Sequence, residues 1–67
     1  MYTHMGDVVR ALRKDQGLTQ SQLARLAGVG RKAVLNIEMT GHGHISSLES
    51  ILGVLGYELE VVPIWPH

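Results

Sequence analysis

Amide and basic side chains gather in two short segments of this 67-residue sequence, at residues 19–22 and 31–36. The first segment is rich in glutamine, and the second holds arginine, lysine and asparagine. Arginine and lysine pair with phosphate, arginine also donates two hydrogen bonds to a guanine edge, and asparagine or glutamine can pair with adenine. This set of donors is typical of nucleic-acid binding, and the alternative is a pair of ordinary solvated helix starts.

The charge of the chain is divided between its two halves. The formal net charge is zero, from six basic and six acidic residues. All the basic residues lie between positions 10 and 32, where Asp15 is the only acid, whereas residues 33–67 carry four glutamates. The basic residues are Arg10, Arg13, Lys14, Arg25, Arg31 and Lys32. This division predicts two surfaces with different partners, and random surface scatter is the alternative.

Catalytic and metal-binding chemistry have little support in the sequence. No histidine accompanies a nucleophile in a recognisable arrangement, and no glycine-rich phosphate loop follows a strand pattern. His42 and His44 flank Gly43, but two imidazoles without a nearby carboxylate or thiolate make a poor zinc site, and the chain has no cysteine. We therefore predict a protein that is not an enzyme and has no catalytic residue, metal site or cofactor.

Helical periodicity positions the candidate side chains. The spacing of apolar residues predicts helices over about 7–15, 20–27 and 31–39, and a fourth that begins at a Ser46–Glu49 capping box. Thr19 is expected to cap the second helix, and glycines 17, 28 and 56 to end the first, second and fourth. The expected buried residues are Val8, Val9, Leu12, Leu23, Leu26, Ala27, Val34, Ile37, Leu48, Ile51, Leu52 and Leu55.

The end of the chain follows a different period. Residues 57–61 alternate between apolar and acidic, which predicts a strand that Val62 extends and Pro63 ends. Since no second strand is evident in the sequence, we expect this one to pair with its copy in a two-fold homodimer. The side chains expected at this interface are Tyr57, Leu59, Val61 and Val62. A frayed tail is the alternative, and Trp65 is expected to cover the dimer or contact a partner protein.

Two short helices joined by a glycine turn describe a helix-turn-helix. The residues Thr19-Gln20-Ser21-Gln22-Leu23-Ala24, followed by Gly28-Val29 and Ile37-Glu38, resemble the Cro and phage-repressor type of helix-turn-helix regulators over residues 6–56. The resemblance implies an all-α, repressor-like domain of four to five helices at residues 1–56. Residues 57–67 then form the dimerisation strand and tail. The chain departs from the family at Gly30, where serine or threonine is common before the third helix.

The third helix would enter the major groove of double-stranded DNA by its N-terminal end, reading a palindromic operator. Resemblance to the family implies that Gln20 grips the DNA backbone and that Arg13 and Glu38 form a structural ion pair between the first and third helices. Thr19 is expected mainly to cap the second helix and secondarily to contact a phosphate. Thr40 and His42 would lie near phosphates. The side chains expected at the DNA are Thr19, Gln20, Arg31, Lys32, Ala33, Asn36, Thr40 and His42.

A narrower resemblance comes from the strand pattern that follows the helices. A repressor-type domain followed by Leu55-Gly56-Tyr57-Glu58-Leu59-Glu60-Val61 is similar to HipB-type antitoxins. That resemblance implies a repressor of its own operon that neutralises a HipA-like Ser/Thr kinase toxin. The alternatives are a stand-alone transcriptional regulator without a toxin, and a protein-interaction module that does not bind DNA.

Composition bounds the remaining possibilities. With 45% hydrophobic and 18% charged residues, the chain suits one small folded domain, whose modest core favours an oligomer. No apolar stretch approaches the roughly eighteen residues needed to span a bilayer, and the first residues lack the pattern of a secretory signal. We therefore expect a soluble, cytoplasmic protein without a membrane partner.

Overall fold

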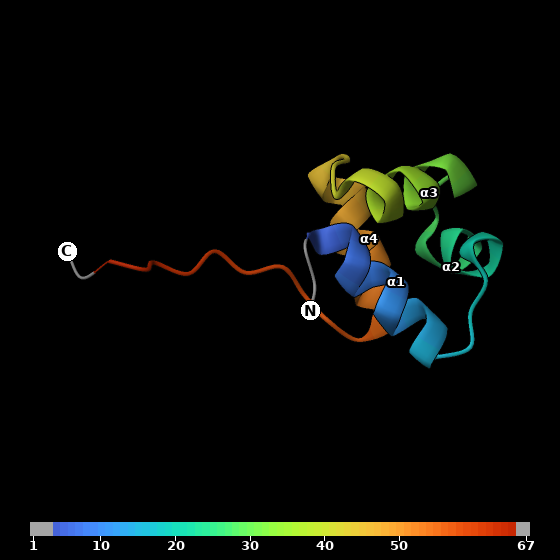
Figure 1. Ribbon diagram of the computed structural model, residues 1–67, viewed down its shortest axis with the longest axis horizontal. Coiled ribbons are helices and arrows are strands. Elements are labelled where there is room, and N and C mark those ends of the chain that lie inside the picture. The colour runs from blue at the N-terminus through green and yellow to red at the C-terminus, as the bar shows by residue number, and fades with distance from the viewer. Residues whose placement is uncertain (1–3, 66–67) are drawn as a thin grey trace.

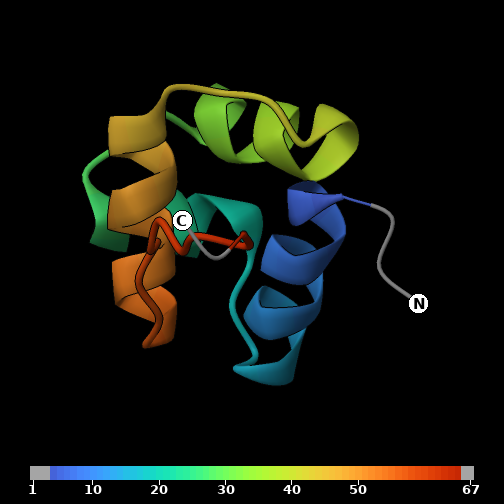
Figure 2. The same cartoon turned by 90° about the vertical axis from the view of Figure 1, so that its left-hand side faces the viewer.

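A computed structural model describes residues 4–65, which form four α-helices and an extended C-terminal arm (Figure 1). The helices are α1 (Met5–Asp15), α2 (Gln20–Ala27), α3 (Arg31–Thr40) and α4 (Ile45–Leu55). Figure 2 shows α1 and α4 on either side of the domain, with α3 lying across their N-terminal ends. None of the helices in the described part of the chain could cross a membrane. The predicted all-α class is confirmed.

A single apolar core joins the four helices. Its fully buried members come from every helix and are Val9, Leu23, Ala24, Val34, Ile37, Ile51, Leu52 and Leu55. Burying one such aliphatic side chain contributes roughly 1.5–3 kcal/mol, so the core is the main source of stability. All but Ala24 were expected in the core from their spacing. Apolar periodicity therefore located the buried residues of α1, α3 and α4 and part of those of α2.

Leu26 was expected in the core, and this prediction is wrong because the side chain is 62% exposed. The buried residues of α2 are Leu23 and Ala24, with Ala27 partly buried beside them. At about 100° per residue, Leu26 is rotated well away from the centre of that face. A short helix buries a narrow stripe, and Leu26 falls outside it.

Capping determines where α2 begins and ends. The Thr19 hydroxyl accepts a hydrogen bond from the Gln22 N–H at 3.0 Å, and the Gln22 carboxamide oxygen accepts one from the Thr19 N–H at 2.8 Å. This is a complete capping box. At the other end Gly28 has φ +70°, a left-handed conformation that glycine adopts without steric cost, and the chain turns into α3. The predicted helix-turn-helix is therefore formed.

The start of α4 differs from the prediction. The helix begins at Ile45 after an extended His44, and no side chain caps it, so the predicted capping box of Ser46 and Glu49 is not formed. A capping residue must have extended backbone angles. Because the loop after α3 reaches helical geometry two residues early, Ser46 already lies inside the helix and its hydroxyl cannot take that position.

The contact between α1 and α3 depends on a glycine. Gly6 is buried, and a Cβ atom there would overlap the carbonyl oxygen of Ile37 and lie 2.7 Å from that of Glu38. The helix begins two residues earlier than predicted because His4 caps it, with the imidazole Nδ1 accepting a hydrogen bond from the Gly6 N–H at 2.9 Å. The first turn of α1 therefore packs directly on the backbone of α3.

The C-terminal arm, residues 57–65, contains no strand, so the strand predicted over residues 57–62 is not formed in the single chain. The arm points away from the helices (Figure 1), with only Leu59 packed against the core. Val61 is 99% exposed and Ile64 80%. A strand exists only where a second strand accepts its backbone hydrogen bonds, and none lies beside the arm in the described residues. Pairing across a dimer stays a prediction.

Candidate nucleic-acid interface

A buried ion pair joins α1 to α3. The Arg13 Nε donates to Glu38 Oε2 at 2.7 Å and its Nη2 donates to Oε1 at 2.9 Å, so the contact is bidentate. Only 1% of the Glu38 side chain and 11% of the Arg13 side chain are exposed. The hydrogen bond to Glu38 raises the pKa of Arg13 more than burial lowers it, and the guanidinium stays charged. The ion pair implied by the family resemblance is present.

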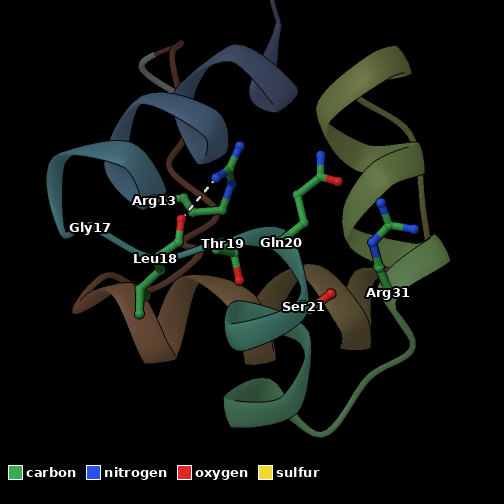
Figure 3. Close-up of a pocket in the computed structure, with 7 residues that line it drawn as sticks. All are labelled: Arg13, Gly17, Leu18, Thr19, Gln20, Ser21 and Arg31. Atoms are coloured by element: carbon green, nitrogen blue, oxygen red, sulfur yellow. Dashed lines mark hydrogen bonds between the residues drawn. The ribbon is translucent and has the colours of Figure 1, made fainter.

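The same guanidinium also fixes the connection between α1 and α2. Arg13 Nη1 donates to the Leu18 carbonyl oxygen at 2.8 Å, the dashed line in Figure 3. Removing one partner of a buried ion pair leaves a charge that neither water nor protein satisfies. Arg13 therefore positions three parts of the domain at once: α1, the loop that follows it, and α3.

Gln20, the first residue of α2, points toward the same carboxylate. Its Nε2 donates to Glu38 Oε1 at 3.3 Å, a long hydrogen bond. Gln20 was expected to grip the DNA backbone, and its side chain is partly buried beside the ion pair. Residues of α1 and α2 thus meet one glutamate of α3, and the relative positions of the three helices are set at that point.

A shallow, open pocket of about 400 Å³ lies next to the ion pair, where α2 and α3 begin (Figure 3). It is lined by Arg13, Gly17, Leu18, Thr19, Gln20, Ser21 and Arg31. The first N–H groups of a helix have no acceptor within the helix, and its N-terminus carries partial positive charge. With the guanidinium of Arg31 beside the start of α2, this pocket is suited to an anion such as phosphate.

The first turn of α3 presents basic side chains to solvent. Arg31 and Lys32 are exposed and Ala33 is partly buried, while Val34 and Ile37 point into the core. Gly30 precedes the helix and gives no side-chain cap, which agrees with the departure from the family noted at that position. The helix is held by its apolar side, and its basic N-terminal end stays accessible.

Asn36, Thr40 and His42 meet where α3 ends, and their hydrogen bonds order the loop that follows. The Asn36 Nδ2 donates to the His42 carbonyl oxygen at 2.9 Å, and the Thr40 hydroxyl donates to the Asn36 carbonyl oxygen at 2.8 Å. The His42 N–H in turn donates to the Thr40 hydroxyl oxygen at 3.1 Å. Asn36 was expected to face DNA, but one of its amide hydrogens is engaged within the protein.

The remaining predicted residues are separate from this surface. Tyr57, Val61, Val62 and Trp65 are exposed on the arm, and Leu59 is half-buried against the helices. Sequence reasoning gave no role to Arg10, whose Nε lies 3.8 Å from Glu38 Oε1. Its spacing of three residues from Arg13 places both on one face of α1, and this signal was available in the sequence.

Comparison with known proteins identifies this arrangement. A family model described as a helix-turn-helix matches residues 9–62, most of the chain. The chain belongs to the helix-turn-helix family of the Cro and phage-repressor type. The immunity repressor protein of Bacillus phage phi105 is 34% identical over 59 residues, which cover 87% of this chain and 41% of the phage protein. The chain thus spans less than half the length of that relative.

Solved structures of SinR share the helix-turn-helix architecture. The N-terminal DNA-binding domain of SinR from Bacillus subtilis has a TM-score of 0.72 at 31% identity, covering 79% of this chain and 80% of that one. SinR in complex with DNA gives 0.69 at 32% identity, covering 76% and 84%. The SinR–SinI complex gives 0.73 at 30% identity, covering 81% and 54%. The matched relatives are regulators and not enzymes, which confirms the non-enzymatic assignment.

Proposed function

We propose that this helix-turn-helix domain is a sequence-specific transcriptional repressor that binds double-stranded DNA in the cytoplasm as a homodimer. One observation carries the proposal: Gln20, at the start of α2, and Arg31, at the start of α3, line one open pocket next to the Arg13–Glu38 pair. A DNA-reading surface needs phosphate donors and base donors held rigidly with respect to each other. The buried ion pair supplies that rigidity.

Base recognition is assigned to the first turn of α3. With its N-terminal end in the major groove, Arg31 would donate to guanine, Lys32 to guanine or phosphate, and Ala33 would contact a thymine methyl group. A bidentate arginine–guanine contact contributes about 1–3 kcal/mol of discrimination. The exposure of Arg31 and Lys32 supports this role, as does the likeness to SinR, which has been solved in complex with DNA.

Backbone binding is assigned to the start of α2 and to the loop after α3. The pocket at Thr19 and Gln20 would receive one phosphate. In this proposal Asn36 and Thr40 act chiefly by holding the loop, so that His42 lies near a second phosphate. Phosphate contacts fix the register of a protein on the duplex, which leaves discrimination to α3.

The homodimer is proposed from the arm. Tyr57, Val61 and Val62 are exposed in a segment that alternates apolar and acidic residues. Antiparallel pairing of two arms would bury those side chains and satisfy the backbone groups. Two reading helices related by a two-fold axis would then meet a palindromic operator at successive major grooves, roughly 34 Å apart.

Selection of duplexes from a random pool, followed by fluorescence anisotropy, tests the proposed function. The chain is expected to enrich a palindromic sequence and to bind it at least tenfold more tightly than a scrambled duplex of equal length. Arg31→Ala should remove most of that preference, whereas Arg25→Ala removes the same charge from the last turn of α2 and should leave the preference intact. Failure to enrich any sequence would favour the protein-interaction module instead.

A second candidate function, the antitoxin, is favoured by the apolar end of the arm. Ile64 and Trp65 are exposed, and an aromatic side chain beside prolines loses little entropy on entering a partner's pocket. Co-expression of the tagged chain with its neighbouring genes, followed by mass spectrometry, tests this role. A kinase-sized neighbour recovered in stoichiometric amounts would support a HipA-like toxin partner, and its absence would leave a stand-alone regulator.

A further inference from the structure

We propose that Arg10 binds a DNA phosphate, so that the protein contacts the duplex with α1 as well as with α2 and α3. The inference rests on the proposed DNA binding and adds to it a contact that sequence reasoning did not assign. It starts from Glu38, whose single negative charge is approached by two guanidinium groups.

Glu38 is fully engaged before Arg10 is considered. Arg13 donates to both carboxylate oxygens, at 2.7 and 2.9 Å, and Gln20 donates to Oε1 at 3.3 Å. The Arg10 Nε lies 3.8 Å from Oε1, beyond hydrogen-bond distance, and 47% of the Arg10 side chain is exposed. One carboxylate charge balances Arg13, and the charge of Arg10 remains available to a ligand.

The position of Arg10 connects it to the phosphate pocket. Gln20 Nε2 and Arg10 Nε approach the same oxygen, Glu38 Oε1, so the two side chains lie on neighbouring sides of one atom. Gln20 also lines the pocket that contains Arg31. Arg10, on α1, therefore lies close to Gln20, a residue of the pocket that Arg31 also lines at the start of α3.

An arginine suits this position because its guanidinium has five N–H donors in a fixed plane and can pair with phosphate in a bidentate manner. Asp7 precedes Arg10 by one helical turn. A pairing between the two on an exposed helix surface is weak, and it does not hold the guanidinium away from a phosphate. The expected ligand is the backbone of double-stranded DNA, regardless of base sequence.

The salt dependence of binding distinguishes a phosphate contact from a structural role. We would measure the Kd for a selected duplex and for a scrambled one over a range of potassium chloride concentrations, using the full chain and the variants R10Q, R10K and R25Q. Each half of the proposed dimer supplies one Arg10, so for R10Q the slope of log Kd against log salt should fall by about two on both duplexes. R10K keeps the charge and should keep the slope, and R25Q should change it by less than half as much.

Three outcomes would overturn the inference. An R10Q variant that binds more weakly with an unchanged slope would show that Arg10 acts through Glu38 and not through phosphate. A slope change in R25Q equal to that in R10Q would show only a general charge effect. If the wild-type chain binds neither duplex at low salt, the proposed function itself fails, an outcome distinct from the other two. Thermal melting of each variant verifies that it is folded at the temperature of the assay.

Discussion

Two regions of the molecule differ in the kind of side chain that they bury: the junction, where Arg13 and Gln20 contact Glu38, and the C-terminal arm. At the junction a charged side chain, Glu38, is 1% exposed, whereas on the arm an apolar side chain, Val61, is 99% exposed. The junction is complete within one chain, because the partners of the buried carboxylate come from α1 and α2. The arm has no such partner among the described residues. Stability therefore depends on the junction and the core, whereas the proposed dimerisation would depend on the arm.

The largest effect on stability is expected at the junction. Arg13→Ala leaves Glu38 buried without its ion pair, and breaking a buried pair in this way costs about 3–5 kcal/mol. A domain of this size has little stability in reserve, so most of the variant should be unfolded at room temperature. Urea denaturation followed by circular dichroism measures the change. A loss below about 1 kcal/mol, within the range of exposed pairs, would mean that water reaches the pair in solution.

The next effect concerns the packing of α1 on α3. Gly6→Ala places a methyl group against the backbone of α3, and overpacking of this kind costs about 1–3 kcal/mol. Gly53→Ala is the matched control, because the space around Gly53 in α4 is open. Replacing a helical glycine by alanine there should stabilise the domain by up to about 1 kcal/mol. Thermal melting of both variants should give shifts of opposite sign, and equal shifts would contradict the close contact at Gly6.

Arg31 lines the pocket beside the Arg13–Glu38 pair, and its replacement should change stability little and DNA binding strongly. Arg31→Ala should alter the free energy of unfolding by less than about 0.5 kcal/mol, since the side chain is exposed. It should weaken binding to the selected duplex by about 1–3 kcal/mol for each half-site and relax specificity at one base pair of each half-site. Anisotropy titrations on selected and scrambled duplexes measure the loss of affinity and the loss of specificity. An equal loss on the two duplexes would mean that Arg31 contacts only phosphate.

The smallest effect on the single chain is expected in the arm. Val61→Pro removes a backbone donor and prevents strand pairing, yet it touches nothing in the helical domain. The melting temperature at low protein concentration should not change, while analytical ultracentrifugation should show a monomer in place of a dimer. Val61→Thr, which keeps strand propensity, is the control. A dimer that survives Val61→Pro would place the interface elsewhere.

Local signals made most of the helical domain predictable. Apolar spacing and capping residues are read within one turn, so they located four helices, the Thr19 cap and the glycine ends. The same rules failed at Ser46, where the path of the preceding loop decided the helix start, and at Leu26, where the buried stripe was narrower than expected. In both cases the surroundings of the residue decided its position, and its amino-acid type did not reveal them.

The candidate site was predictable only in part. Arg13 and Glu38 are 25 residues apart, and no local rule pairs them; the family resemblance did. The role of Asn36 in the loop and the place of Arg10 beside Glu38 depend on the tertiary arrangement, so spacing alone did not reveal them. The strand predicted in the arm from its alternating residues is not formed in the single chain, and its pairing with a second molecule stays a prediction.

The way α3 is attached has a consequence for how such domains diversify. The helix is held by Val34, Ile37 and Glu38, whereas Arg31 and Lys32 project into solvent from its first turn. In the proposed complex with DNA, substitutions at those two positions would alter the preferred base sequence without disturbing the groups that keep the domain folded. A lineage of such proteins would then acquire new operators by single steps, each of which passes through a folded protein.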